Sequence, residues 1–272
     1  MDTTHWRLVK TSFGDGAWNM AVDEAILEAV GRSAVLPTLR LFAWDPPCLS
    51  IGYAQPAGDV DRPALTSLGW RLVRRPTGGR AILHTDELTY SVIALLHEPR
   101  VSGSVLESYS RLAQALLLAL HTLALPAQAK AVYGRAGRNP NPICFEVPSN
   151  YEITVDGKKL IGSAQARRKE GVLQHGSLPL FGDLTRITRV LTFSDKAQRA
   201  EAAARLLEHA TTVETVLNRR VSWEQAAAAF EDAFCQALNL VFEPSELSPG
   251  ELQRADELVS QKYGHPSWTD RV

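Results

Sequence analysis

One cysteine and one lysine are the residues of this chain best suited to chemistry. Cys144 lies in a short segment bounded by prolines, and Lys159 follows fifteen residues later, after an Asp-Gly pair. A free thiol has a pKa near about 8.5 and attacks only as the thiolate, so a reactive cysteine needs a cation or a base beside it. Lys159 is the candidate cation, and the pair predicts acyl transfer through a cysteine thioester. Cys48 and Cys235 are interpreted as small hydrophobic residues that only pack.

A second candidate segment has the sequence RRPTGGRAILH over residues 74–84. It combines cations, bare backbone and an imidazole in Arg75, Thr77, Gly78, Gly79 and His84. The Gly-Gly pair alone indicates only a turn, but these neighbours favour a binding site. The segment lacks the Gly-Lys-Ser/Thr ending of a phosphate loop, and the chain has no Gly-x-Gly-x-x-Gly fingerprint. Neither standard nucleotide motif is therefore present.

The strand that carries Lys159 supplies three more candidates. Gly162, Ser163 and Ala164 keep this strand slim, which lets a ligand approach its backbone. Adjacent side chains of a strand point to opposite faces, so only one of Lys158 and Lys159 can face a pocket, and the other is expected in solvent.

Two histidines do not have the sequence context of metal ligands. His84 and His175 lack the close spacing to other His, Cys or carboxylate residues that a metal site needs. Each is interpreted as a hydrogen-bonded structural histidine, and no metal is expected.

The composition is that of an ordinary globular protein. The 272 residues are 45% hydrophobic, and 29 basic and 30 acidic residues leave a net charge of -1. A surface that follows nucleic-acid phosphates would need an excess of Lys and Arg, so no nucleic acid is expected. There is no signal-peptide pattern and no run of about 18 apolar residues, which predicts a cytoplasmic protein without a membrane partner. Three distant cysteines indicate neither a disulfide framework nor a zinc ribbon.

Hydrophobic periodicity predicts the elements that must position the candidates. Helices are expected over 18–30, 105–123, 196–209, 223–240 and 248–263, and strands over 39–44, 48–51, 70–75, 81–83, 88–93, 151–155, 159–166 and 171–180. In the first helix, Asp23 and two glutamates are placed on faces other than the apolar one. The strands around His84 are expected to continue one sheet, residues 156–157 to close a tight hairpin, and 134–142 to form a mobile loop leading to Cys144.

The order of these elements predicts an α+β fold. Strands early, a hairpin in the middle and helices late indicate a mixed β-sheet with packed helices and a helical C-terminal layer. Alternating βαβ units are not indicated.

Several motifs in the same order resemble the lipoate-protein ligase A and octanoyltransferase family, most closely its cysteine-dependent octanoyltransferases of the LipM type. The resemblance covers roughly residues 6–240. Its motifs are NMAVDEA at 19–25, the Arg75 to His84 segment with ELTYS at 87–91, Cys144, Lys159 with GSAQ at 162–165, and HGS at 175–177. The family implies a catalytic domain of the biotin/lipoate ligase type, expected over 1–242, with a helical extension over 243–272 packed on it.

The resemblance also implies roles for the candidate residues. Cys144 matches the acyl-thioester nucleophile, and Lys159 matches the family lysine that would lower the thiol pKa and hold the thioester carbonyl. The residues implied to bind the acyl substrate are Arg75, Thr77, Gly78, Gly79, His84, Gly162, Ser163 and Ala164.

The implied activity is that of an acyltransferase in protein lipoylation. It would move an octanoyl group from octanoyl-acyl carrier protein to a lysine of a lipoyl domain, with the glycine-cleavage H protein as the expected acceptor. Exchange of one thioester for another and then amide formation need no ATP, so no cofactor is expected. The protein is expected to be a monomer. The sequence does not show which group takes the proton of the acceptor lysine.

Other activities stay open. One is an ATP-dependent lipoate-protein ligase. The ligases of the family have a sequence similar to Arg-Arg-x-Ser-Gly-Gly-Gly at the turn and Asn-Asp before the hairpin strand. At these places this chain has TGGR (77–80) and YE (151–152). These departures disfavour a ligase. An amidotransferase could move octanoyl or lipoyl groups between lipoyl domains, and a non-enzymatic lipoate-binding or carrier module would bind without turnover.

Overall fold

The structure is a computed structural model that describes residues 2–131, 143 and 151–272. Cys144 and the predicted loop over 134–142 lie outside the described residues. The strands are β1 (Thr4–Gly14), β2 (Thr38–Trp44), β3 (Cys48–Ile51), β4 (Arg71–Arg74), β5 (Ile82–His84), β6 (Glu87–Ala94), β7 (Gln128–Ala131), β8 (Tyr151–Val155), β9 (Lys158–Arg168), β10 (Gly171–Pro179) and β11 (Leu240–Ser245). The α-helices are α1 (Gly16–Gly31), α2 (Arg62–Ser67), α3 (Val105–Thr122), α4 (Lys196–His209), α5 (Val213–Leu217), α6 (Trp223–Leu238), α7 (Pro249–Leu258) and α8 (Pro266–Thr269). Short segments of other helix types are η1 (Ala57–Asp59), η3 (Leu184–Arg189) and the π-helix η4 (Val259–Tyr263).

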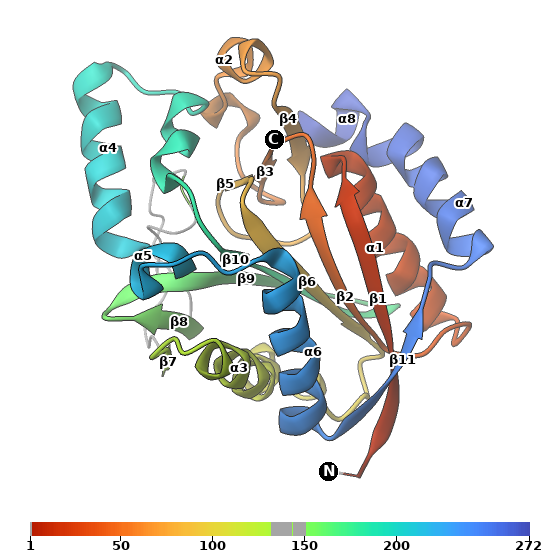
Figure 1. The fold of residues 1–272 in the computed structure, drawn as a ribbon. Coiled ribbons are helices and arrows are strands. Elements are labelled where there is room, and N and C mark those ends of the chain that lie inside the picture. Colours follow the sequence, from red (N-terminus) through yellow and green to blue (C-terminus); the bar gives the residue numbers. More distant parts are fainter. Residues whose placement is uncertain (1, 132–142, 144–150) are drawn as a thin grey trace.

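A mixed sheet forms the centre of the molecule (Figure 1). Its strand order is β11-β1-β2-β6-β10-β9-β8-β7. β1 runs parallel to β11 and β2, and the other neighbours are antiparallel. The hairpin between β8 and β9 closes as predicted, because Asp156 and Gly157 both have positive φ (49° and 77°), as a tight primed turn requires. The predicted α+β fold with a mixed sheet is confirmed.

A second, smaller sheet corrects the expectation of one continuous sheet. β3 lies between β4, to which it is parallel, and β5, to which it is antiparallel. β6 returns to the main sheet, where it pairs with β2 and β10. Alternation of apolar side chains indicates that a segment is a strand but not which strand it pairs with, which is why the pattern could not separate the two sheets.

Helices cover both faces of the main sheet. α3 and α6 pack together on one face over a core that includes Leu116, Phe230 and Tyr90. α1 lies on the opposite face, and α7 packs on its outer side (Figure 1). A third apolar cluster joins the small sheet to α4 and η3. The small sheet and α1 therefore enclose a space over one face of the main sheet.

The first helix is more buried than its sequence pattern predicts. Asp23 has no solvent exposure, although it was placed on a polar face. The reason is that α1 lies between the main sheet and the C-terminal helix α7, so both of its long sides are covered. A charged residue is buried here only because it is paired, as the site shows.

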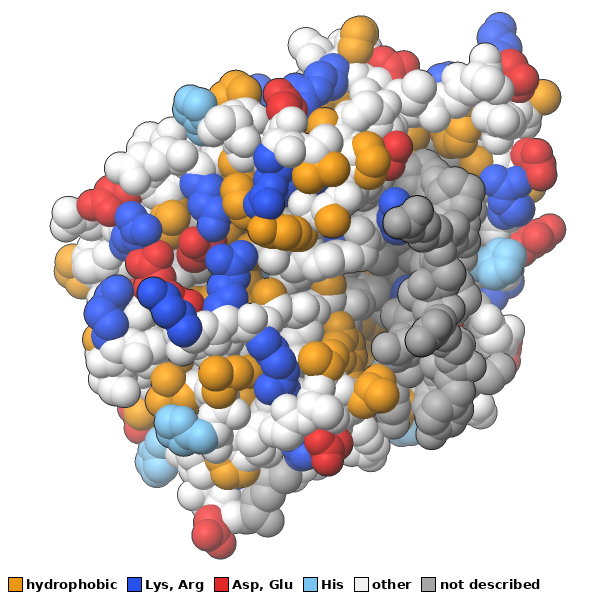
Figure 2. All heavy atoms as spheres, turned by 180° about the vertical axis from the view of Figure 1, so that it is seen from behind, with side chains coloured by type: hydrophobic (Ala, Val, Ile, Leu, Met, Phe, Trp, Pro, Cys, Tyr) orange, Lys and Arg blue, Asp and Glu red, His pale blue; other side chains and the backbone are white. Residues whose placement is uncertain are grey.

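The outer surface carries charges of both signs. On the face seen from behind, Lys and Arg side chains gather beside Asp and Glu side chains and small apolar patches (Figure 2). No helix of the part that the structure describes has the length and apolarity needed to cross a membrane.

Candidate active site

A cavity lies between α1, the small sheet and strands β6, β9 and β10 of the main sheet. Its lining residues are Met20, Trp44, Arg75, Ile82, His84, Thr89, Gly162, Ser163, Ala164, His175, Gly176 and Ser177. Five of the predicted substrate-binding residues, from two segments about 80 positions apart in the chain, therefore line one cavity.

The other three predicted binding residues line a more open cleft. Thr77, Gly78 and Gly79 form its wall together with Arg80, and β9 closes the opposite side with residues 165–168. The Gly-Gly turn thus belongs to the cleft, and Arg75 at its start belongs to the cavity.

Arg75 holds the Gly-Gly turn in place. Its guanidinium is buried and donates to the carbonyl oxygens of Gly78 and Arg80, both at 2.9 Å. It also donates to the carbonyl oxygen and the hydroxyl of Ser50 in β3, at 2.9 and 2.8 Å. One side chain of the cavity lining therefore ties the turn to the small sheet.

His84 is fixed from three sides. Its Nδ1 lies 2.6 Å from Oε1 of Glu87, and its Nε2 lies 2.7 Å from the hydroxyl of Ser50. Its ring stacks on the Trp44 ring at 3.9 Å with an interplanar angle of 8°. Burial raises the pKa of Glu87, but the His84 charge and three hydrogen bonds outweigh burial and hold this pKa below its ordinary value. Glu87 is therefore an ionised acceptor, and Nδ1 of His84 is the donor to it.

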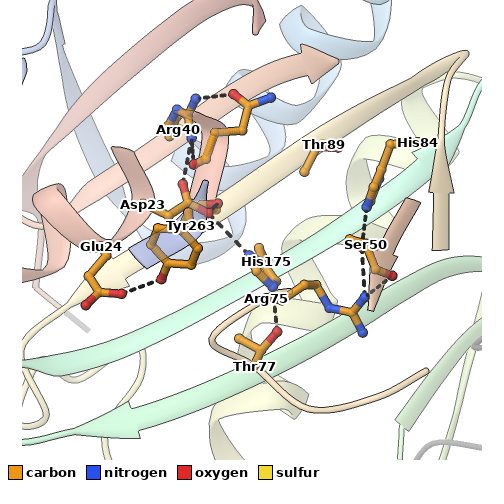
Figure 3. A network of polar contacts seen from close by, with 12 residues as sticks. Asp23, Glu24, Arg40, Ser50, Arg75, Thr77, His84, Thr89, His175 and Tyr263 are labelled. Carbon is orange, nitrogen blue, oxygen red and sulfur yellow. Dashed lines mark hydrogen bonds and ion pairs between the residues drawn. The ribbon is translucent and has the colours of Figure 1, made fainter. Parts of the chain in front are cut away.

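A second buried histidine connects the cavity to the cleft (Figure 3). Nε2 of His175 lies 2.7 Å from the hydroxyl of Thr77, and Nδ1 lies 3.2 Å from a carboxylate oxygen of Asp23. His175 lines the cavity, and Thr77 lines the cleft. Burial lowers the pKa of His175 below its ordinary value, although the Asp23 carboxylate acts in the opposite direction. At neutral pH the imidazole is therefore uncharged.

Asp23 is anchored by an arginine that is itself fully buried. Arg40 of β2 donates to Asp23 at 2.8 Å and to the side-chain oxygen of Asn19 at 2.7 Å, and Ser91 donates to the other Asp23 oxygen at 2.8 Å. Burial raises the pKa of Asp23, but Arg40 and His175 outweigh burial and hold this pKa below its ordinary value. The carboxylate is therefore ionised and rigidly placed.

Lys159 lies at the start of β9 and is not in the lining of the cavity or the cleft. Its side chain is buried, and its Nζ lies 3.3 Å from Oε1 of Glu152 in β8. Lys158 is exposed, as alternation along the strand predicts. Since a strand rises about 3.3 Å per residue, Lys159 is about 10 Å along β9 from the cavity residue Gly162.

Cys144 lies outside the described residues, but Ile143 before it is placed. Ile143 is buried, forms a parallel bridge with Ala81 at the end of the Gly-Gly turn, and packs in the apolar cluster that also contains Ala210. Lys159 bridges the same Ala210. For the other two cysteines, burial raises the pKa of Cys48 well above, and that of Cys235 above, the ordinary value, which agrees with a packing role.

Sequence reasoning missed the buried polar residues around the cavity. Asp23, Arg40, Ser50 and Glu87 were not predicted as site residues, and His175 was interpreted as structural. A charged residue inside an apolar stretch, as Arg40 in LRLFAW, was the available signal, because a buried charge requires a partner. The identity of that partner depends on strands and helices far apart in the chain.

The family model for the lipoyl protein ligase A/B catalytic domain matches residues 15–235. Among similar proteins, the octanoyltransferase LipM of Kyrpidia tusciae is 43% identical over 98% of both chains, and that of Symbiobacterium thermophilum is 41% identical over 98% of this chain and 99% of its own. These relatives are acyltransferases, which confirms the prediction of an acyltransferase.

Solved structures agree with the family. A bipartite lipoate protein ligase from Thermoplasma acidophilum, studied with its E2 lipoyl domain, has a TM-score of 0.80 and 25% identity, covering 100% of this chain and 98% of its own. A lipoate-protein ligase A bound with ATP has a TM-score of 0.75 and 26% identity, covering 99% of both chains. The predicted family is thereby confirmed: this chain belongs to the family of lipoyl protein ligase A/B catalytic domains.

Proposed function

We propose that this protein is an octanoyltransferase that moves an octanoyl group from octanoyl-acyl carrier protein to a lysine of a lipoyl domain through a thioester on Cys144. The lining of the cavity carries this proposal, because it joins apolar walls from Met20, Trp44 and Ile82 to slim strands that an acyl chain can approach. Burying an acyl tail at about 0.8 kcal/mol per methylene supplies on the order of 5 kcal/mol, enough to discriminate chain lengths that differ by a few carbons.

The proposed reaction has two steps. The Cys144 thiolate attacks the carrier thioester, a new C–S bond forms, and the carrier thiol leaves. The amine of the acceptor lysine then attacks the Cys144 thioester, the C–N bond forms, and the Cys144 thiol is restored. The first step exchanges one thioester for another and the second forms an amide, so neither needs ATP.

Lys159 is proposed to assist the first step. A buried ammonium favours a nearby thiolate because an opposite charge lowers a thiol pKa. Lys159 forms a bridge with Ala210, and Ile143, the residue before Cys144, belongs to the apolar cluster that contains Ala210, which supports a position of the lysine near the thiol.

The proposed acceptor is a lipoyl domain, with the glycine-cleavage H protein as the specific candidate. The octanoyltransferases among the relatives support the octanoyl group, and the archaeal ligase that was studied with its E2 lipoyl domain supports an acceptor of this class.

Intact-protein mass spectrometry tests the thioester. The wild type incubated with octanoyl-acyl carrier protein without ATP is expected to gain one octanoyl mass, and Cys144→Ala is expected to gain none. Cys235→Ala is the matched control and should gain the adduct, because Cys235 lies in α6 outside the site. Absence of the adduct from the wild type, or its presence on Cys144→Ala, contradicts the mechanism.

A lipoate-protein ligase is the second candidate, because solved relatives at 25 and 26% identity are ligases and one of them was bound with ATP. The open cleft offers Arg80, Arg167 and Arg168 to an anionic group. A ligase would attach free lipoate only with ATP and would keep its activity in Cys144→Ala. An amidotransferase, by contrast, would accept an octanoylated H protein as its sole donor.

A further inference from the structure

The geometry points to Asp23, His175 and Thr77 as a proton relay that takes the proton of the acceptor lysine during the amide-forming step. This inference rests on the proposed function, and it names the group that receives a proton in its second step. The relay begins at a buried carboxylate on α1 and ends at a hydroxyl in the wall of the cleft (Figure 3).

The hydrogen-bond pattern determines which atom is basic. Asp23 is ionised and can only accept, so Nδ1 of His175 must carry the proton that it receives. Nε2 then has a free electron pair, and it faces the Thr77 hydroxyl at 2.7 Å. Carboxylate, imidazole and hydroxyl stand in the same order as in hydrolase triads.

The surroundings keep the imidazole ready to accept a proton. Ser91 of β6 and Ala164 of β9 are its neighbours in the sheet and carry no charge. The charged and titratable groups that face His175 are Asp23 from α1, backed by Arg40 of β2, Arg75 from the turn after β4, and His84 from β5, which is paired with Glu87 of β6. The carboxylate of Asp23 then stabilises the imidazolium once it forms.

The position of the relay suits an amine that enters from the cleft. Thr77 lies beside Gly78 and Gly79 on the cleft wall, and His175 lines the cavity that would hold the acyl chain. Thr77 thus links the cleft, from which a lysine can approach, to the histidine that lines the space for the acyl group.

The proton balance of the step is as follows. An acceptor lysine with a pKa near about 10.4 arrives as the ammonium. One of its protons passes to the Thr77 oxygen while the Thr77 proton passes to Nε2 of His175. The amine attacks the thioester carbonyl, the C–N bond forms, the C–S bond breaks, and a second nitrogen proton goes to the departing thiolate of Cys144. The imidazolium finally releases its proton to solvent.

Single-turnover transfer from the preformed octanoyl enzyme to H protein tests the relay. For the fraction of His175→Gln or Thr77→Val that carries the octanoyl group, transfer at pH 7 should be slower by about 100-fold or more than for the wild type, within the usual range for acid-base catalysis. Thr77→Ser keeps the hydroxyl and should transfer within a few-fold of the wild type. His5→Gln, on the exposed part of β1, is the control histidine.

The pH profile separates the relay from a packing role. With the relay intact, the transfer rate should be constant above pH 6.5 until the acceptor amine titrates, and should fall once His175 is protonated below that pH. Without the relay, the transfer rate depends only on the fraction of the acceptor lysine that is a free amine. It should therefore rise about tenfold per pH unit from pH 6 to 9. A double variant that combines His175→Gln with Thr77→Val should transfer no more slowly than His175→Gln alone, because both substitutions interrupt the same relay.

Each result has one meaning. If the wild type forms no thioester, the proposed function fails. If the thioester forms but both variants transfer at the wild-type rate, or slow down with an unchanged pH profile, the relay is wrong. If His175→Gln does not fold, the nearly isosteric Thr77→Val gives the same answer on the same two measurements.

Discussion

At the scale of single residues, the Gly-Gly turn packs closely on the end of β3. The glycines at this contact therefore differ in how well they tolerate a larger side chain. A Cβ atom on Gly52 would lie 1.9 Å from the carbonyl oxygen of Gly79, and Gly79 itself has a φ of 92°. A Cβ atom on Gly78 would meet no described atom within 4 Å. The packing of the turn on β3 therefore requires glycine at positions 52 and 79 but not at position 78.

This difference predicts opposite stability effects. Gly52→Ala should lower the free energy of unfolding by roughly 1–3 kcal/mol, because overpacking forces the backbone apart. Gly78→Ala should leave this free energy unchanged or raise it by up to about 1 kcal/mol, since alanine restricts the unfolded chain. Urea unfolding followed by circular dichroism measures both variants, and equal losses would refute the close contact.

At the scale of elements, the C-terminal helix α7 is held to the first strand by a buried ion pair. Both terminal guanidinium nitrogens of Arg7 in β1 donate to the Glu251 carboxylate in α7, and both side chains are buried. Ser248 caps the same helix through a reciprocal capping box with Glu251. Because α7 covers α1, this contact also supports the helix that carries Asp23.

Loss of the Glu251 carboxylate should lower the free energy of unfolding more than loss of the Ser248 cap. Glu251→Ala leaves the Arg7 charge buried without its partner, which typically costs about 3–5 kcal/mol. Ser248→Ala removes only the cap and should cost about 1 kcal/mol. Thermal and urea unfolding of the two variants should reproduce this order, and a smaller loss for Glu251→Ala would show that α7 contributes little to the fold.

At the scale of the whole molecule, His175, Asp23 and Glu87 make the free energy of unfolding fall as the pH is lowered below 7. The pKa of His175 is lowered in the folded state, so the unfolded chain binds more protons below pH 6.5 and folding weakens there. The pKa values of Asp23 and Glu87 are also lowered, so their contributions are present above their ordinary values of 3.8 and 4.5 and are lost on further acidification.

The free energy of unfolding should therefore fall in two stages as the pH is lowered from 7. The first stage begins below about pH 6.5 and belongs to His175, and the second begins below about pH 4.5 and belongs to the carboxylates. Urea titrations at a series of pH values measure both. His175→Gln should flatten the first stage and keep the second, whereas an unchanged first stage would assign it to another group.

Much of the fold followed from local patterns. The helix over 196–209 and the strand over 151–155 have the predicted bounds, and helix 223–240 ends two residues early because Asn239 adopts a left-handed conformation. β1 and β11 were not predicted. β1 has buried side chains on both faces, Leu8 and Val9 among them, and so lacks the alternation of a half-buried strand.

The sequence by itself determined the family, the α+β class and the set of residues whose chemistry suits acyl transfer, because these depend on residue types and their order along the chain. Only the tertiary structure decided which of them meet. Arg75 and His84 share a cavity with Ser163. Thr77 instead lines the cleft, and its hydroxyl is hydrogen-bonded to His175, 98 residues away in the chain. Such pairings depend on strand register and helix placement, and no local pattern specifies which distant polar group a buried charge will find.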